Sequence, residues 1–480
     1  MQPLIVIVGA GPTGLGAAWR LQELGYSNWL LIDRHPYVGG LATSFLDDHG
    51  FTWDIAVHVT HSHYRYFDEL LDKVLPGGFL EHQRLAWVRT ATAWVPYPFQ
   101  NNIRHLPLPA QQECLAGLRE LQQAAGRPPH QKGSDDESLR NDHSHLETSR
   151  GLPASFQDWI LQTFGRGIAD HFLLPYNRKI WSTCPTEMNW HWLGERIPVV
   201  DLERVERNVR EQSDDVAWGP NYRFRFPQRG GTGAIWKAIA ARLPAQQIRL
   251  RTSLQKLDIQ QREVTLSDGS RLPYDSLIST MPITQLVALT GQQSWVRAAS
   301  QLRHTRVQVV CLACEFPLPT HLHGKTWIYC PSAEAIFYRV TPFSTFSPAH
   351  VPHPERQCSF LCEVSTIGSG TPWREEDLEE QTMRGFAALN LAPVNRQNTR
   401  FVHLHAAHGY PIPTLDRDNH LQHIIPELEA QQIYSRGRFG GWKYEVSNMD
   451  HSVMQGVEAV NRIILGEPEI TWHSPAQVNT

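Results

Sequence analysis

The stretch Leu4–Gly16, which reads LIVIVGAGPTGLG, decides the fold of this chain. Apolar residues typical of a buried strand lead into a glycine-rich turn, and a helical pattern follows at once. Gly9 permits the tight turn, Gly11 lets the backbone approach a pyrophosphate, and Gly14 lets the helix pack against the strand. The helix N-terminus offers free N–H groups and a partial positive charge to phosphates. The stretch therefore predicts the phosphate-binding turn of a doubly wound α/β domain.

Two further features extend this turn into a dinucleotide site. The apolar run Trp29–Ile32 ends in Asp33, about 20 residues after the glycine turn, where an acidic side chain takes ribose hydroxyls. Val38–Leu41 is a second glycine turn, which brings backbone close to a bound group; an ordinary loop is the alternative. A glycine triplet alone fits other α/β turns, but a triplet followed by an acidic strand end predicts a dinucleotide cofactor.

The length and charge of the chain limit what it can be. Its 480 residues exceed one ordinary core, so we expect two or three domains. The net charge of -4, with both signs mixed, argues against nucleic-acid and polybasic membrane partners. No apolar run reaches the roughly 20 residues that span a bilayer. The first strand follows Met1 so closely that we expect no signal peptide and a cytoplasmic location.

Cysteine and histidine predict neither a disulfide framework nor a metal site. Seven cysteines in so long a chain do not resemble a disulfide-rich scaffold. Cys311 and Cys314 form a CxxC, but they lie in the strand-like run VQVVCLACEF, where residues three apart face opposite sides, so we expect core packing. His58, His61 and His63 have no acidic or cysteine partner at ligand spacing, and we expect no bound metal.

Changes of pattern along the chain predict an α/β protein with three regions. These are a Rossmann-like dinucleotide-binding domain, a helical insertion domain and an antiparallel β-sheet domain that contacts substrate. The insertion includes a helical pattern from Ala154 to about Gln212, and Asp450 and Ser452 are predicted to cap a last helix, from about Val453 to Leu465. The predicted boundaries are 1–85, 220–292 and 428–470 for the dinucleotide-binding domain, 102–212 for the insertion with a flexible loop at 127–150, and 86–101 and 293–427 for the sheet domain.

Eight motifs, in order along nearly the whole chain, carry a resemblance to a known family. They are GAGPTGLGAAWRL, SHYRYFD, WVPYPFQNNI, GIADHFLLPYN, WLGER, FRFPQRGGTG, HGYPIPTL and SRGRFGGWKYEV. Together they resemble the UDP-galactopyranose mutases of the eukaryotic type, flavoenzymes that interconvert UDP-galactopyranose and UDP-galactofuranose. The resemblance thus implies a UDP-sugar as the partner of this chain.

The resemblance also implies that the dinucleotide is FAD. The last helix would direct its N-terminus toward the flavin, where the helix dipole favours the anionic reduced form. The reduced flavin would be the active form, with NADPH or NADH as a candidate reductant. The matching cofactor residues are Gly9, Gly11, Pro12, Thr13, Gly14, Asp33, Arg34 and Leu254 at the adenosine-diphosphate end, and Gly40, Leu41, Arg438, Asn448, Met449 and Ser452 at the flavin.

In the family's reaction the cofactor itself acts as the nucleophile. N5 of the reduced flavin attacks the anomeric carbon and UDP leaves; the sugar then opens and recloses through another hydroxyl, and UDP returns. The protein must hold the detached UDP, a task suited to arginine forks on phosphate oxygens. Arg196 and Arg339 match the two arginines that do so, although an isolated arginine more often forms a salt bridge.

Other matching residues outline a substrate pocket, although any one aromatic among them would more often belong to the core. The uridine set is Tyr97, Phe99, Gln100, Asn177 and Trp181; the phosphate-contacting tyrosines are Tyr329, Tyr410 and Tyr444; the residues around the sugar are Arg84, Trp327 and Asn221. His58 and His63, with Val57, complete the predicted catalytic set.

The chain departs from the family at three places. Ala56 and Val57 stand where the family has two glycines before the histidine matched by His58. The peptide of the second glycine reorients as the flavin changes redox state, and a β-branched residue restricts that movement. His61 replaces a phenylalanine near the base, and Phe346 replaces a tyrosine, which removes a hydroxyl donor worth about 1 kcal/mol.

Three functions remain open on the sequence. The first is interconversion of UDP-galactopyranose and UDP-galactofuranose. The second keeps the UDP site but acts on another sugar, as a mutase or as an oxidoreductase. The third is a UDP-sugar-binding homologue without catalysis. The sequence leaves the oligomeric state open, and fold alone does not choose among the three functions.

Overall fold

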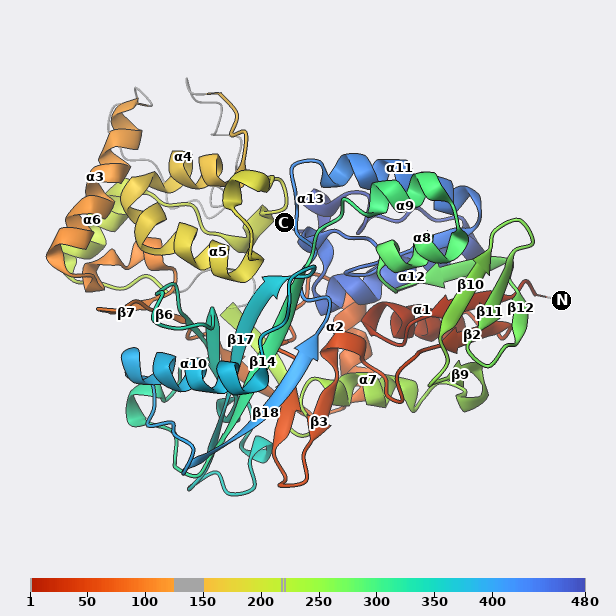
Figure 1. Ribbon diagram of the computed structural model, residues 1–480, viewed down its shortest axis with the longest axis horizontal. Coiled ribbons are helices and arrows are strands. Elements are labelled where there is room, and N and C mark those ends of the chain that lie inside the picture. Colours follow the sequence, from red (N-terminus) through yellow and green to blue (C-terminus); the bar gives the residue numbers. More distant parts are fainter. Residues whose placement is uncertain (1, 125–150, 217–218, 220–221, 480) are drawn as a thin grey trace. The chain divides into compact units, whose positions relative to one another are not determined.

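The computed structural model describes residues 2–124, 151–216, 219 and 222–479 (Figure 1). The chain forms two compact units. Unit 1 comprises Met1–His82, Phe224–His304 and His408–Thr480, and unit 2 comprises Gln83–Arg223 and Thr305–Ala407. The predicted flexible loop at 127–150 and the predicted sugar-binding residue Asn221 lie outside the described residues.

The centre of unit 1 is a five-stranded parallel sheet. Its strands, in spatial order, are β19 (Ile433–Ser435), β13 (Ser276–Ser279), β1 (Ile5–Val8), β2 (Trp29–Ile32) and β9 (Ile248–Arg249). Alternate residues of β1 enter two different cores, Ile5 and Ile7 in one and Val6 and Val8 in the other. The sheet is therefore covered on both faces, as parallel sheets are, and the predicted α/β class is confirmed.

Helices and a small antiparallel sheet supply these two cores. The first contains residues of α1 (Pro12–Glu23), α2 (Arg65–Val74), α7 (Gly233–Ala240) and α12 (Met449–Leu465). The second contains residues of α8 (Ile283–Thr290), α9 (Gln293–Ala299), α11 (Arg417–Ala430), β10 (Leu254–Asp258) and β11 (Glu263–Leu266), and β11 pairs with β12 (Arg271–Pro273). Shorter elements are the β3–β4 hairpin (Ser44–Leu46 and Thr52–Asp54), β5 (Phe79–Gln83) beside β8 (Arg223–Pro227), and α13 (Pro475–Val478).

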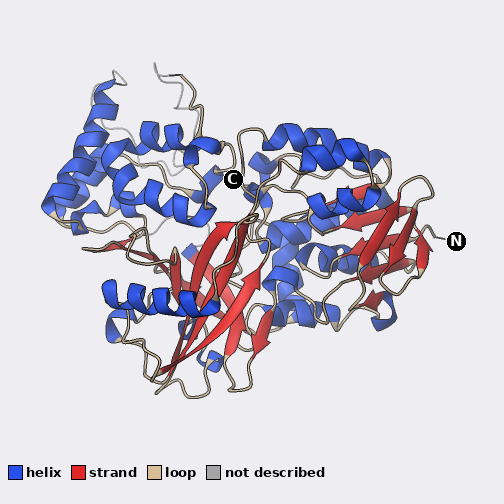
Figure 2. Cartoon of the chain, in the orientation of Figure 1, coloured by secondary structure: helices blue, strands red, loops and turns tan. Residues whose placement is uncertain are grey.

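Unit 2 is built on a seven-stranded sheet (Figure 2). The order is β18 (Thr399–Ala406), β14 (Thr305–Cys314), β17 (Cys358–Ile367), β16 (Arg339–Pro342), β15 (Ile328–Tyr329), β6 (Trp87–Arg89) and β7 (Trp94–Pro96). The sheet was predicted to be antiparallel, and it is, except where β15 pairs with β6 in parallel. Cys311 and Cys314 are both fully buried in β14, which confirms their core role. Helix α10 (Glu375–Ala388) packs on this sheet (Figure 1).

The helical part of unit 2 is less regular than predicted. It contains α3 (Leu108–Ala124), α4 (Phe156–Ile168), a π-helical turn at Ala169–Leu173, α5 (Leu174–Trp181) and α6 (Leu202–Glu211). Between α5 and α6 the chain forms turns and short 3-10 segments, so the prediction of helix throughout 154–212 was too broad. Prolines at 185 and 198 interrupt the helical hydrogen-bond pattern there.

The two units cut across the three predicted regions. The predicted insertion at 102–212 and most of the predicted sheet domain at 293–427 share unit 2, whereas α9 and α11, which the prediction placed in the sheet domain, lie in unit 1. Their apolar faces explain the difference, because they pack on the parallel sheet. Among the described residues no helix combines the length and apolar character needed to cross a membrane.

Candidate functional site

The glycine turn of unit 1 is hydrogen-bonded to the Asp33 side chain. The Ala10 N–H donates to Asp33 Oδ2 at 2.7 Å, and the His35 N–H donates to Oδ1 at 2.7 Å. The predicted ribose acceptor therefore also holds the glycine turn against the end of β2. Each carboxylate oxygen can accept a second hydrogen bond, so Asp33 retains capacity for a hydroxyl.

A backbone cradle for a nucleotide lies where the two glycine turns meet. A Cβ added to Gly40 would lie 3.2 Å from the Gly11 Cα, which is closer than ordinary contact, and the φ of +54° at Gly40 also favours glycine. Backbone without side chains is what a pyrophosphate needs in order to come close. Gly11 is also the N-cap of α1, which presents unpaired N–H groups. These residues fit an FAD pyrophosphate. The other predicted residues of this end include Leu254, buried at the start of β10, and the exposed Arg34.

Arg438, which was predicted to contact the flavin, is hydrogen-bonded to two other segments of unit 1. Its Nε and Nη2 donate to the Ser447 carbonyl at 3.3 and 3.2 Å, and its Nη1 donates to the Gly409 carbonyl at 3.4 Å. Ser447 immediately precedes Asn448, the N-cap of α12, and Gly409 immediately precedes Tyr410. Tyr410 lies edge-on to Tyr444, with ring centroids 5.7 Å apart. One guanidinium thus joins three predicted site segments.

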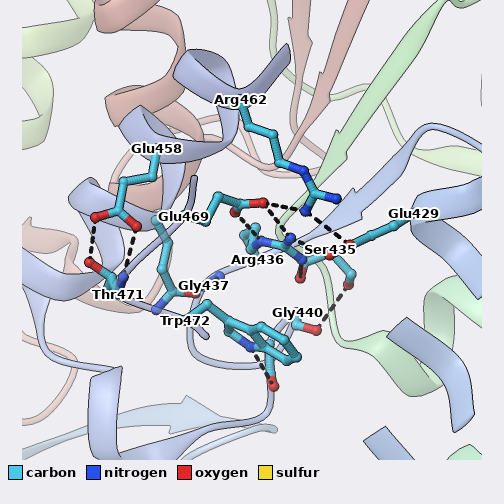
Figure 3. Close-up of polar contacts among 12 residues, drawn as sticks. Glu429, Ser435, Arg436, Gly437, Gly440, Glu458, Arg462, Glu469, Thr471 and Trp472 are labelled. Carbon is cyan, nitrogen blue, oxygen red and sulfur yellow. Dashed lines mark hydrogen bonds and ion pairs between the residues drawn. The ribbon is translucent and has the colours of Figure 1, made fainter. Parts of the chain in front are cut away.

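A buried ion network supports the turn that carries Arg438 (Figure 3). Arg436 is fully buried, and its Nη2 donates to Glu469 Oε1 at 2.7 Å and also to Glu429. Arg462 reaches the same two carboxylates, each at 2.9 Å. Glu469 lies between the two guanidinium groups (Figure 3) and fixes the C-terminal segment to the start of this turn.

Trp472 adds a second anchor from the same C-terminal segment. Its indole N–H donates to the Gly441 carbonyl at 3.2 Å, and Lys443 Nζ lies 4.0 Å from its ring centroid. Residues outside every predicted site motif therefore hold the Arg438 turn from both ends. Sequence reasoning missed them, because nothing local relates residues 469 and 472 to residues 436–441.

The turn that contains Ala56 and Val57 is held by Asp54. This carboxylate is fully buried and accepts hydrogen bonds from Ser44 and from the Thr232 N–H and hydroxyl, and the Thr232 hydroxyl also lies 2.9 Å from the His58 carbonyl oxygen. Burial raises the pKa of Asp54 to about 6, although these hydrogen bonds oppose the shift. Ala56 adopts φ +63°, in the left-handed region, whereas Val57 does not. Of the two positions, only position 56 therefore has a backbone conformation that favours glycine.

Replacing Ala56 with glycine should raise the free energy of unfolding by about 1 kcal/mol, because a Cβ in the left-handed region costs roughly that much. Urea unfolding of the holoprotein would measure the change. Val57→Gly is the matched control, since it adds freedom where no positive φ is needed, and it should destabilise by roughly 0.5–1 kcal/mol. The prediction is wrong if Ala56→Gly unfolds at the same or a lower urea concentration than the wild type.

His63 meets Asp450, the second residue of α12. Its backbone N–H and its Nδ1 lie 3.0 and 2.8 Å from Asp450 Oδ2, and His451 Nδ1 lies 3.3 Å from Oδ1. Burial favours the neutral acid, but the two histidines outweigh burial and hold the pKa of Asp450 well below its usual range.

The predicted caps of the last helix were wrong: Asn448 is the N-cap, and Asp450 and Ser452 lie in the first turn. His63, Asp450 and His451 also place three potential ligand atoms within 4.8 Å of one another. The expected absence of a metal stays a prediction.

In unit 2 two of the predicted substrate tyrosines are in contact with each other. Tyr97 and Tyr329 lie edge to face, with ring centroids 5.3 Å apart, and the Arg84 guanidinium lies 5.5 Å from the Tyr97 ring. Tyr176 of α5 also lies edge-on to Tyr329, with ring centroids 5.0 Å apart. Burial raises the pKa of Tyr97 well above its usual range, so its hydroxyl stays protonated and able to donate.

Residues of the predicted uridine set differ in what they can offer. Gln100 is 1% exposed; its Nε2 donates to the Pro198 carbonyl at 2.7 Å, and its buried Oε1 has no hydrogen-bond partner among the described residues. A buried acceptor left open in this way fits an N–H of a ligand. Asn177 and Trp181 bond to each other at 3.2 Å on α5. Phe99 is fully buried and stacks on Phe172, which is core packing.

The two predicted diphosphate arginines occupy different surroundings. Arg339, on β16, forms a bidentate ion pair with Glu363 of β17, with both N–O distances 2.8 Å. Glu363 is fully buried and also accepts from the Tyr338 hydroxyl at 2.5 Å. Glu363 thus fixes the orientation of the Arg339 guanidinium. Arg196 ends a 3-10 turn and is half-buried.

The remaining predicted residues are placed as follows. Trp327 and Phe346 are buried, and the Phe346 ring packs edge-on to Phe343 in the core. His61 lies beside His63 in unit 1, with ring centroids 5.6 Å apart. Sequence reasoning missed Glu363, although a single glutamate within the apolar strand CSFLCEVSTI was a usable signal.

Comparison with known proteins adds a family. Residues 12–464 match the family described as flavin containing amine oxidoreductase. A crystal structure of reduced UDP-galactopyranose mutase is similar to this chain over 100% of its length and 99% of the other, with 40% identity and a TM-score of 0.89.

More distant structures share the fold alone. A putative protoporphyrinogen oxidase from Exiguobacterium has 15% identity and a TM-score of 0.70 over 97% of this chain and 100% of the other. A putrescine oxidase has 16% identity and a TM-score of 0.62 over 97% of this chain and 99% of the other.

Proposed function

We propose a function for this chain, which belongs to the flavin containing amine oxidoreductases and to the family of UDP-galactopyranose mutases. It is a flavin-dependent isomerase, and FAD is its cofactor. The reaction we propose is the interconversion of UDP-galactopyranose and UDP-galactofuranose. The observation that carries this proposal is the 40% identity to a UDP-galactopyranose mutase over the whole chain. The eight motifs that resemble the eukaryotic type support it further.

The contacts in unit 2 support a role in holding UDP. Arg339 and Arg196 would grip the diphosphate while it is detached from the sugar, with the Arg339 fork aligned by Glu363. The open acceptor of Gln100 would take an N–H of the uracil edge. Tyr97 and Tyr329 would complete the wall of the pocket, and a buried phenol donates well to a phosphate oxygen.

The contacts in unit 1 support a role in holding reduced FAD. When bound and reduced, the flavin supplies through N5 the nucleophile for covalent catalysis at the anomeric carbon. Arg438 donates to the Ser447 carbonyl, next to the N-terminus of α12, which begins at Met449. The guanidinium charge and the free N–H groups of the helix are therefore close together, and such charge stabilises an anionic ring. Asp33 would hold the ribose. The expected reductant is NADPH or NADH.

Conversion of UDP-galactofuranose by the reduced holoenzyme tests the proposal. Protein reduced with dithionite under anaerobic conditions should form UDP-galactopyranose over many turnovers, and the oxidised protein should not. Chromatography of the nucleotide sugars measures the product. Failure of the reduced protein to convert the sugar, with FAD and UDP both bound, would overturn the proposal.

The Ala56–Val57 turn favours a second candidate, an oxidoreductase or a mutase of another UDP-sugar. The turn is unlike the family's two glycines, and the left-handed Ala56 restricts its freedom. Anaerobic mixing of oxidised protein with UDP-sugars separates the reactions, since sugar oxidation bleaches the flavin stoichiometrically and isomerisation does not. Tight UDP binding with neither reaction would indicate a homologue without catalysis.

A further inference from the structure

Lys179 of α5 is bound by a ring of backbone carbonyl groups. Its Nζ lies 2.8 Å from the carbonyl oxygen of Cys330, 3.0 Å from that of Ser332, 2.6 Å from that of Ala335 and 2.8 Å from that of Phe337. All four belong to the segment 330–338, which joins β15 to β16 and which we call the β15–β16 loop. No predicted site motif assigned a role to this lysine.

Such a ring requires a cation at its centre. An ammonium group has only three hydrogens, so four converging carbonyls are held in part by attraction between the charge and the carbonyl dipoles. Proteins bind potassium in the same way, with carbonyl oxygens that replace the water around the ion. Burial lowers the pKa of Lys179 to about 8, which leaves the ammonium charged at neutral pH. Without it, four carbonyl oxygens would face one another uncompensated.

The ring joins two segments that carry predicted substrate residues. On α5, Lys179 lies between Asn177 and Trp181, which bond to each other at 3.2 Å. The β15–β16 loop is bounded by Tyr329 and Arg339, which are directly paired across the two strands. Lys179 therefore ties the helix that carries uridine residues to the hairpin that carries diphosphate residues.

The loop has few backbone hydrogen bonds of its own, although Ala335 and Phe337 are buried in the core of unit 2 and the Tyr338 N–H donates to the Glu363 carbonyl at 3.0 Å. Its closing hydrogen bond runs from the Cys330 N–H to the Tyr338 carbonyl at 2.8 Å, and the residues between form turns and bends. Two of the four carbonyls that bind Lys179 lie near its ends and two lie within it. A cation at their centre therefore joins both ends and the middle of the loop to α5.

We propose that Lys179 is a positioning residue that holds the uridine-binding helix and the diphosphate-binding hairpin in register, so that UDP is bound at both ends as one ligand. This inference rests on the proposed function, because it takes UDP as the ligand. In this role Lys179 touches no substrate atom. It acts through Tyr329 and Arg339 on the hairpin and through Asn177 on the helix.

Two substitutions separate a cation-dependent role from a general structural one. Lys179→Met fills the space with an apolar chain, whereas Lys179→Ala leaves a hole lined by four carbonyls. Both variants, as holoenzymes, should bind UDP at least 10-fold more weakly than the wild type, with unchanged FAD content. Adding KCl or NH4Cl should restore UDP binding in Lys179→Ala, tetramethylammonium chloride of equal ionic strength should not, and none of the salts should restore Lys179→Met. Arg178→Met, an exposed change on the same helix, is the matched control and should bind UDP normally.

Calorimetric titration with UDP measures these affinities. Wild-type affinity in Lys179→Met, or equal recovery of Lys179→Ala in tetramethylammonium, overturns the positioning role. If the wild type itself binds no UDP, the proposed function fails, and this inference fails with it. If neither variant folds, hydrogen exchange of the wild-type holoenzyme decides: UDP should slow exchange of the amides at 330–338, and unchanged exchange there overturns the inference.

Discussion

A protein in which Glu469 is replaced by glutamine is expected to unfold with a free energy about 3 kcal/mol lower than that of the wild type, because removing one member of a buried ion pair leaves the others uncompensated. The Glu469 side chain is fully buried between Arg436 and Arg462. Glutamine preserves the shape but not the charge. Reversible urea unfolding at pH 7 with saturating FAD measures the difference.

The pH dependence of this difference identifies its origin. Burial favours the neutral acid, but hydrogen bonds and charge from Arg436 and Arg462 hold the pKa of Glu469 below its usual 4.5. Between the folded and the unfolded pKa the unfolded chain binds more protons, so this contribution is present above pH 4.5 and is lost as the pH falls. The gap between wild type and Glu469→Gln should therefore narrow on acidification below pH 4.5.

Glu467→Gln is the matched control for this experiment. Glu467 lies two residues earlier, is exposed, and accepts a hydrogen bond from Asn461 at 2.8 Å. Exposed interactions of this kind contribute about 0–1 kcal/mol, so this variant should unfold nearly as the wild type does. Equal effects of the two substitutions, or a gap that does not change with pH, would contradict the assignment. The network also supports the Arg438 turn, so Glu469→Gln should weaken FAD binding.

Replacing Arg339 by lysine is expected to weaken UDP binding and to lower kcat/KM by roughly 10- to 100-fold, which corresponds to the loss of one or two hydrogen bonds to a charged group. The guanidinium pairs with Glu363 through Nε and Nη2, and we expect the same planar group, oriented by this pair, to contact the diphosphate. A single ammonium cannot satisfy both directions. Calorimetry and the mutase assay on reduced protein would measure the loss.

Lysine keeps a positive charge beside Glu363, so this variant should fold. Arg306→Lys on β14 of the same sheet provides the control, since Arg306 donates to the carbonyls of Gly368 and Gly370 in the folded chain. It should leave UDP binding unchanged. A wild-type Kd for UDP in Arg339→Lys would show that Arg339 does not contact the diphosphate, whatever its effect on the sheet.

Local patterns were enough to predict the centre of unit 1. The apolar run before Gly9, the glycine spacing and Asp33 lie within about 30 residues of one another, and each constrains its own neighbours. The core role of Cys311 and Cys314 likewise followed from one strand. Even the unfamiliar Ala56–Val57 pair was recognisable as a departure. The sequence could not say which of the two bears the left-handed conformation, because that depends on how Asp54 and Thr232 hold the turn.

The sequence by itself determined the glycine turn, the α/β class and, through eight motifs, the family and its flavin cofactor. Only the tertiary structure decided how these residues are held. Asp450 and His63 meet although 387 positions separate them, and Lys179 reaches the β15–β16 loop across more than 150 positions. Contacts of this kind leave no periodic pattern in the chain, because a side chain's partner is set by where the backbone brings it and not by its neighbours in sequence. The partners of Glu469, Glu363 and Lys179, which hold the predicted site residues in place, were therefore visible only in the folded protein.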